Sequence, residues 1–205
     1  MVAPIIFIVL AFVGAAVTSG YSHVSDPISQ LAALGSPHPG WMTTGFITYG
    51  IMILGFGFAL YRSVREHRFA WLVLLFYFLH GIGFLLGGVF SDDSRAVESI
   101  RTTSGSLHNV GIIIGCSSFE GGMFVFAWLK RNDPTWRIIA RIFMVLLIII
   151  LLIYIVNQIP AVAAAAEGLV QRVFGFLAIV LIEMAAIRLL VSLKRWRVES
   201  STQLH

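Results

Sequence analysis

Six long apolar runs divide this 205-residue chain almost from end to end. Each run approaches the ~20 residues that a helix needs to cross the hydrocarbon core of a membrane. Hydrophobic residues make up 58% of the chain, which is more than a soluble domain of this size can bury. We therefore predict an all-α polytopic membrane protein, with one transmembrane domain over residues 1–205 and six helices in a single bundle. The expected spans are residues 2–19, 42–61, 70–90, 107–129, 138–156 and 173–193.

Basic residues alternate between the loops. Lysine and arginine gather after the second run, after the fourth run and in the tail, whereas the loop from Gly20 to Trp41 has neither. Short loops rich in these residues stay in the cytoplasm, so we expect both termini to be cytoplasmic and the protein to lie in the plasma membrane. The net charge of +4 reflects this pattern, and we expect no nucleic-acid binding. The basic residues are Arg62, Arg65, Arg68, Lys130, Arg131, Arg137, Lys194, Arg195 and Arg197.

The first outer loop, from Tyr21 to His38, has the signals of a short capped helix. Asp26 can accept hydrogen bonds from free backbone amides, and the proline after it suits the first helical position. Gly35, followed by Pro37, is a typical helix end. Such a helix either lies on the membrane surface or folds over the bundle as a lid.

Four short motifs carry a resemblance to a known family. They are His23-Val-Ser-Asp-Pro-Ile-Ser-Gln-Leu31, Phe90-Ser-Asp-Asp93, Leu107-His-Asn109 and Gly168-Leu-Val-Gln-Arg172. Through them nearly the whole chain resembles the prokaryotic membrane proteins grouped as domain of unknown function 998 (DUF998). Members often have proline and cysteine where this chain has Ser91 and Asp92, so Asp93 matches the recurrent acid and Asp92 is an extra charge.

That family is distantly similar to the eukaryotic FRAG, DRAM and SFK group of six-span proteins. The resemblance implies a helical bundle and a connection to lipids. It implies no particular reaction.

The predicted topology places six polar side chains at the outer membrane face. Two imidazoles, two carboxylates and a guanidinium can bind an anionic headgroup, ligate a divalent metal or transfer protons. Each residue also has a structural interpretation, such as a helix cap for the first aspartate and an interfacial hydrogen bond for the second histidine. The six are His23, Ser25, Asp26, Asp93, His108 and Arg172.

A metal at this face would be zinc or another divalent ion held by His23, Asp93 and His108. These residues come from three separate segments, and the chain has no closely spaced histidine pair. The single cysteine, Cys116, excludes a cysteine-rich site. The metal interpretation therefore depends on tertiary structure alone.

A second polar group is expected near the middle of the membrane. His80, Glu120 and Glu183 each lie about ten residues from the cytoplasmic ends of their spans. Ionisable groups at this depth usually face the bundle interior and pair with one another. The three residues form either a proton relay or polar pocket floor, or a structural contact such as a Glu120–His80 pair.

Three classes of function follow. The leading one is binding or transport of a lipid headgroup or small solute through the outer site. The first alternative is a membrane-embedded hydrolase that modifies lipids, with His23, Asp26, Asp93 and His108 either as metal ligands or as acid and base. The sequence does not decide whether the protein is an enzyme. The second alternative is a structural or regulatory protein that docks other helices through glycine-rich faces. Membrane lipids are the expected partners, and a second copy or another membrane protein is a further candidate.

Overall fold

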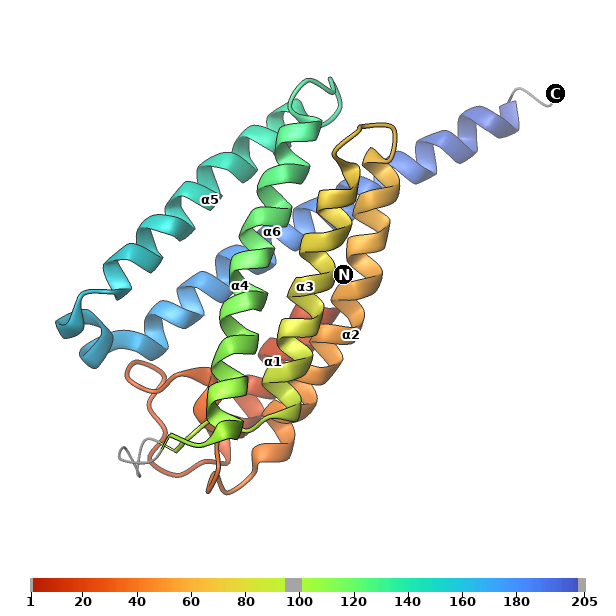
Figure 1. Ribbon diagram of the computed structural model, residues 1–205. Coiled ribbons are helices and arrows are strands. Elements are labelled where there is room, and N and C mark those ends of the chain that lie inside the picture. The colour runs from red at the N-terminus through yellow and green to blue at the C-terminus, as the bar shows by residue number, and fades with distance from the viewer. Residues whose placement is uncertain (1, 95–100, 203–205) are drawn as a thin grey trace.

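The computed structural model describes residues 2–94 and 101–202, and for residues 194–202, including the basic tail, it describes the helical backbone alone. The described part is helical and contains no strand. Five of its helices are long and apolar enough to cross a membrane. The elements are α1 (Ala3–Ala16), η1 (Ile28–Ala32), α2 (Pro39–Val64), α3 (Ala70–Val89), α4 (Thr103–Lys130), α5 (Arg137–Asn157) and α6 (Pro160–Thr202) (Figure 1).

The connections sort to the two ends of the bundle. The segment with η1, the described ends of the α3–α4 connection (residues 90–94 and 101–102) and the α5–α6 connection lie together at one end, which we call the loop end (Figure 1). The short α2–α3 and α4–α5 turns lie at the opposite end, which we call the turn end. In the predicted orientation the loop end faces outward and the turn end faces the cytoplasm.

The first helix is the exception to the expected pattern. α1 has 14 residues, so it is roughly 21 Å long, against the ~30 Å of a hydrocarbon core. It begins about midway along the bundle and runs to the loop end (Figure 1). There Thr18 Oγ1 donates to the Gly14 carbonyl at 2.7 Å, and Gly20 takes a φ of +78°. The described helices therefore include five spans, and a sixth crossing at residues 2–19 stays a prediction.

The first outer loop differs from the predicted capped helix. η1 is a five-residue 3₁₀ helix, and extended Pro27 precedes it instead of forming its first turn. The Asp26 carboxylate accepts the Ser22 amide at 2.7 Å, so it closes the preceding turn and does not cap η1. Leu31 and Ala32 are buried, 1% and 2% exposed, against α1 and α2. The segment is thus folded over the bundle and does not lie free on its surface.

The last helix begins earlier than the sequence pattern indicates. Only residues 158–159 separate α5 from α6, and Pro160 opens α6 where the pattern predicts an outer loop up to residue 172. Proline is well suited to the first turn, which has no need of its amide hydrogen. Ala166 interrupts α6 with φ −145° and ψ 21°, so the segment before the expected span is a kinked first part of the same helix. α6 then crosses behind the other helices at a steep tilt (Figure 1).

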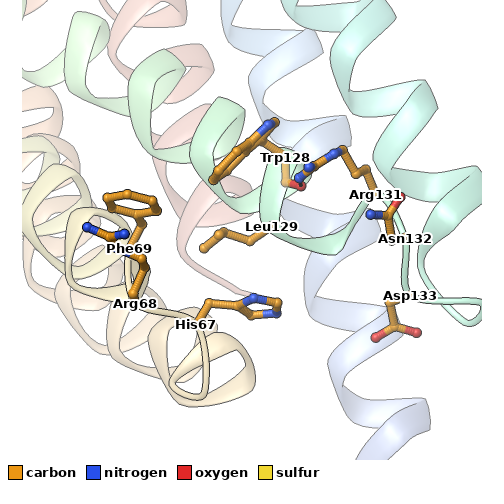
Figure 2. A pocket seen from close by; sticks show the side chains of 8 residues that line it. All are labelled: His67, Arg68, Phe69, Trp128, Leu129, Arg131, Asn132 and Asp133. Carbon is orange, nitrogen blue, oxygen red and sulfur yellow. Dashed lines mark hydrogen bonds between the residues drawn. The ribbon is translucent and has the colours of Figure 1, made fainter.

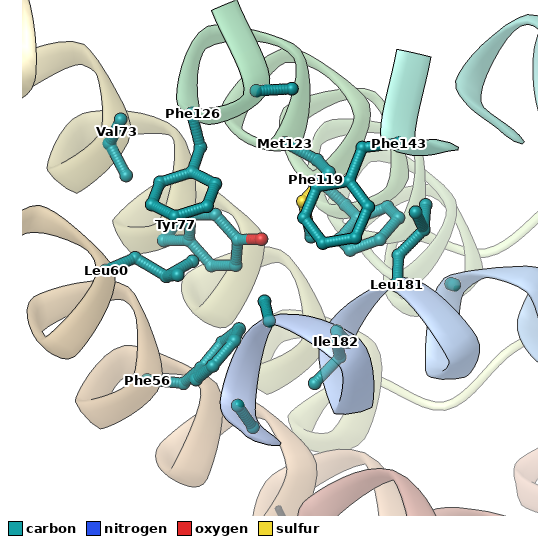
Figure 3. Packing of buried hydrophobic residues seen from close by; sticks show 14 of the residues in the cluster. Phe56, Leu60, Val73, Tyr77, Phe119, Met123, Phe126, Phe143, Leu181 and Ile182 are labelled. Carbon is teal, nitrogen blue, oxygen red and sulfur yellow. The ribbon is translucent and has the colours of Figure 1, made fainter. Parts of the chain in front are cut away.

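All five spans contribute to one apolar core (Figure 3). Of α5, only one stripe is buried, with residues spaced by three or four, and the remaining faces are exposed apolar surface suited to lipid. That stripe is Ala140, Phe143, Leu147 and Ile150. The central residues of the core are Phe56, Leu60, Val73, Tyr77, Phe119, Met123, Phe126, Phe143, Leu181 and Ile182.

α3 and α4 touch through their backbones. A Cβ atom at Gly83 would collide with the Gly111 carbonyl oxygen and lie 2.6 Å from the Gly115 Cα. Small residues permit this approach in lipid, where no hydrophobic force pulls helices together. These glycines therefore pack against each other inside the bundle. They are not available as an exposed face on which another helix could dock. Gly55, in contrast, has no neighbouring heavy atom within 4 Å of its Cβ position.

We expect Gly83→Ala to lower the apparent Tm of the detergent-purified protein by roughly 5 °C, because overpacking costs about 1–3 kcal/mol. Gly55→Ala is the matched control. It adds the same methyl group to open space and reduces the freedom of the unfolded chain, so its Tm should stay equal or rise slightly. Equal losses in the two variants would contradict the close α3–α4 contact.

Candidate functional site

Four residues at the loop end form what we call the arginine cluster: Tyr21, His23, Asp26 and Arg172. Arg172 projects from α6 and donates from Nη2 to the Tyr21 hydroxyl at 2.6 Å and from Nε to His23 Nδ1 at 3.1 Å. Its Nη1 donates to the carbonyl oxygens of Asp26 at 3.1 Å and Gly168 at 2.7 Å. One guanidinium thus joins the first outer loop to α6.

Tyr21 is the second organising residue of the arginine cluster. Its hydroxyl lies 3.1 Å from the carbonyl oxygens of both Asp26 and Pro27, to which it can donate. Burial raises the pKa of the Tyr21 phenol above its usual range, although the hydrogen bond from Arg172 acts in the opposite direction. Tyr21 is therefore a neutral acceptor for Arg172. The Asp26 carboxylate faces its own loop, where it accepts from the Ser22 amide and the Ser25 hydroxyl.

The Gly168–Arg172 motif makes the docking surface for this loop. A Cβ at Gly168 would collide with the Asp26 carbonyl, so glycine lets the loop lie directly on the helix. The Leu169 amide donates to the Val24 carbonyl at 2.9 Å, and the Gln171 side-chain oxygen accepts the Ile28 amide at 2.9 Å. The kink at Ala166, just before the motif, coincides with this contact.

A second group, which we call the aspartate cluster, consists of Asp92, Asp93 and Thr102 and holds the start of α4. Thr102 is the N-cap, and its hydroxyl accepts the Gly105 amide at 2.9 Å while donating to Asp93 Oδ1 at 2.6 Å. The Thr102 amide also donates to Asp93 Oδ2 at 3.2 Å. The Asp93 carboxylate thus sits at the positive end of the helix dipole. It lies so close to Gly105 that a side chain there would collide with it.

Asp92 belongs to the same cluster, where the resemblance had made it only an extra charge. It is 8% exposed and accepts the Gln30 amide group at 3.2 Å and the Asp93 backbone amide at 2.8 Å. Gln30 also donates to the Asp93 carbonyl at 3.0 Å, and the Leu34 amide donates to the Asp92 carbonyl at 3.0 Å. η1 is therefore tied to the α3–α4 connection on one side and to α6 on the other.

His108 lies in the second turn of α4 and is only 1% exposed. Its Nδ1 is 2.9 Å from the Phe90 carbonyl, to which it can donate, and its ring meets Phe46 edge-on at 5.6 Å between centroids. Its Nε2 is buried without a hydrogen-bond partner in the described part of the chain. These contacts are those of a packed residue that joins the end of α3 to α4.

The loop end thus holds all six residues expected there, but in separate networks. His23, Ser25 and Asp26 are in the hydrogen-bond network of Arg172. Asp93 bonds to Thr102, and His108 bonds to the Phe90 carbonyl. Within residues 2–94 and 101–193, no three histidine, cysteine or acidic side chains are grouped so that they could hold a metal ion. No observation of this structure therefore supports a site built from His23, Asp93 and His108.

The midplane group is organised around His80. This residue is 2% exposed, and its Nδ1 lies 2.7 Å from the Gly115 carbonyl while its Nε2 lies 3.0 Å from the Tyr49 hydroxyl. Both ring nitrogens are thus engaged, and neither is left for Glu120 or Glu183. Those two residues are half-buried on α4 and α6.

Several organising residues carry no strong signal in the sequence. Tyr21, Gln30, Tyr49 and Thr102 are common residue types in no motif with a defined chemistry. Thr102 is a residue type common at helix N-caps, but four small or polar residues separate it from the apolar run that begins at Leu107. Tyr49 is recognisable only once α2 and α3 are packed together.

Five apolar spans around one buried core define an integral membrane protein of the helical-bundle class. The comparison with protein families matches residues 1–188 to the family described as "Protein of unknown function (DUF998)". The chain belongs to this family, which confirms the resemblance carried by the four motifs. None of the curated proteins and none of the solved structures matches it.

We expect Arg172→Gln to loosen the first outer loop without unfolding the bundle, because it removes the guanidinium that bonds Tyr21, His23 and the Asp26 carbonyl. Hydrogen–deuterium exchange should show roughly tenfold faster exchange of the Ile28 and Leu169 amides. Arg62→Gln removes the same charge at the turn end and should leave both amides protected. Unchanged protection in Arg172→Gln would show that the other contacts suffice to hold the loop.

Proposed function

We propose that this protein binds the phosphate-bearing headgroup of an anionic lipid at the arginine cluster. The proposal rests on the environment of Arg172, whose guanidinium bonds to four neutral acceptors among the described residues. No carboxylate forms an ion pair with it in the described part of the chain. The positive charge of such a guanidinium can therefore attract an anionic ligand. Hydrogen bonds between guanidinium and phosphate are stronger than those between neutral groups.

Two hydrogen-bond donors at this cluster are available for an anion. A guanidinium has five N–H groups, and the four bonds of Arg172 to described residues leave one on Nη2 without a partner among them. His23 accepts from Arg172 through Nδ1, so the proton of its neutral imidazole is on Nε2, and the side chain is exposed. The Asp26 carboxylate accepts from Ser22 and Ser25 and forms no ion pair with Arg172.

An apolar groove between α5 and α6 supports a lipid over a free anion. Its volume is about 360 Å³, and its α6 wall flanks Arg172 within one helical turn. An acyl chain in this groove would place its headgroup at the level of the arginine cluster. The lining residues are Ile149, Leu152, Ile153, Val156, Leu169, Val170 and Val173.

The interior favours binding over transport. Between the loop end and His80, the rings of Phe7, Phe46, Tyr49 and Phe84 pack against one another with centroids 4.5 to 6.0 Å apart. These rings fill the interface of α1, α2 and α3 on the loop-end side of His80, so a solute moving to His80 along this interface would have to displace them. The proposal is therefore restricted to binding at the membrane boundary.

The test is native mass spectrometry of the detergent-solubilised protein with phosphatidylglycerol and, separately, phosphatidylcholine. We expect preferential retention of phosphatidylglycerol. Arg172→Gln should weaken it by about tenfold, the effect of losing a charge-assisted hydrogen bond. His23→Ala should give a smaller loss, because it removes one exposed donor and leaves the Arg172–Tyr21 bond in place.

His38→Ala is the matched control for His23→Ala, since it removes another exposed histidine of the same loop. Arg172→Lys keeps the charge but loses the planar fork, so it should lie between wild type and Arg172→Gln. Equal retention of phosphatidylglycerol by wild type, Arg172→Gln and His23→Ala would overturn the proposal.

A further inference from the structure

A second cavity lies at the turn end, away from the arginine cluster (Figure 2). Its volume is about 520 Å³, within the range of small-molecule sites. It opens between the α2–α3 turn and the connection from α4 to α5. The lining residues are His67, Arg68, Phe69, Trp128, Leu129, Arg131, Asn132 and Asp133.

Aromatic rings position the two arginines of this cavity. Arg68 Cζ lies 4.6 Å from the Phe69 ring centroid, and Arg131 Cζ lies 4.5 Å from that of Trp128. Figure 2 shows these two pairs on opposite sides of the opening, with the His67 imidazole between them. Arg131 Nη1 also donates to the Trp128 carbonyl, and stacking on a ring face leaves the remaining N–H groups of a guanidinium available to an anion.

The single acid that lines the cavity is already engaged. Asp133 accepts from Lys130 Nζ at 3.1 Å and from the Thr135 amide and hydroxyl at 2.9 and 2.7 Å. Among the described residues, neither Arg68 nor Arg131 forms an ion pair. The cavity therefore presents two cations without an acid partner.

We propose that this cavity binds a phosphate-bearing anion, and that its source is the headgroup of an anionic glycerophospholipid. The Phe69 and Trp128 rings, 6.1 Å apart between centroids, offer an apolar wall to the glycerol and upper acyl region. Aromatic residues of this kind favour the membrane–water boundary, and basic pockets between helices there suit anionic headgroups. The site shares no residue with the arginine cluster, so it stands independently of the function proposed above.

The experiment compares two double variants of the full chain in detergent. Arg68→Gln with Arg131→Gln removes the two cavity arginines, whereas Arg62→Gln with Arg137→Gln removes two charges from the same end that do not line the cavity. Native mass spectrometry counts the phosphatidylglycerol molecules retained by each. We expect the cavity variant to lose one lipid, with about 20-fold weaker binding, and the control to change less than twofold.

Equal losses in both double variants would show an effect of net charge and overturn the proposal, as would no loss in either. Arg172→Gln separates the two sites. This variant should lose a different phosphatidylglycerol molecule and still retain the one that depends on Arg68 and Arg131. The two proposed sites can therefore be confirmed or rejected separately.

Competition with sn-glycerol 1-phosphate distinguishes the sources of phosphate. If it fails to displace the cavity lipid at millimolar concentration, the lipid is the ligand. If it displaces the lipid there, the cavity recognises a soluble phosphate compound, and the lipid part of the proposal is overturned.

A second measurement keeps both cavity arginines in case the arginine variants fold poorly. Brominated phosphatidylglycerol quenches nearby tryptophan fluorescence, so wild type should show a quenched component that Trp128→Phe lacks. Brominated phosphatidylcholine should quench this component less. Equal quenching by the two lipids would overturn the preference for an anionic headgroup.

Discussion

The backbone contact between α3 and α4 at Gly83 is the constraint on which the rest of the bundle depends. Lipid tails offer no hydrophobic drive for helix association, so the helices are held by close packing and by polar contacts across their interface. The same seam brings the Gly115 carbonyl to His80 Nδ1, at 2.7 Å. It also places the end of α3 beside the start of α4, which allows His108 to reach the Phe90 carbonyl and Asp93 to lie on Gly105.

A second constraint acts on the first outer loop. Irregular backbone at the membrane boundary must find partners for its amides and carbonyls, because hydrocarbon supplies none. Here the loop forms hydrogen bonds to α6 through the Gly168–Arg172 motif. It also forms hydrogen bonds to the α3–α4 connection through Asp92 and Asp93. The four motifs that mark this chain as a DUF998 protein therefore lie in or beside one docking network at the loop end. Three of them tie the first outer loop to α6 and to the α3–α4 connection, whereas the Leu107-His-Asn109 motif joins the end of α3 to α4 through His108.

The two ends of the molecule use arginine in a similar way. At the loop end the Arg172 Cζ lies 5.6 Å from the Tyr21 ring centroid, and at the turn end Arg68 and Arg131 lie over Phe69 and Trp128. None of the three has a carboxylate partner in the part of the chain that the structure describes. Fixed guanidinium groups beside apolar surface suit molecules with an anionic head and an apolar tail. Both proposed sites follow from this chemistry.

By itself the sequence determined that the chain is a helical membrane protein, because runs of about 20 apolar residues leave the backbone only helices in hydrocarbon. It also indicated that His23, Asp26, Asp93, His108 and Arg172 gather at one end, since topology alone decides which loops share a side. Only the tertiary structure decided that Asp93 holds the N-cap Thr102 of α4, that Tyr21 joins His23 at Arg172, and that His80 bonds Tyr49 instead of Glu120. These pairings depend on helix rotation and on where a helix ends, as with α6 beginning at Pro160, and hydrophobicity along one chain specifies neither.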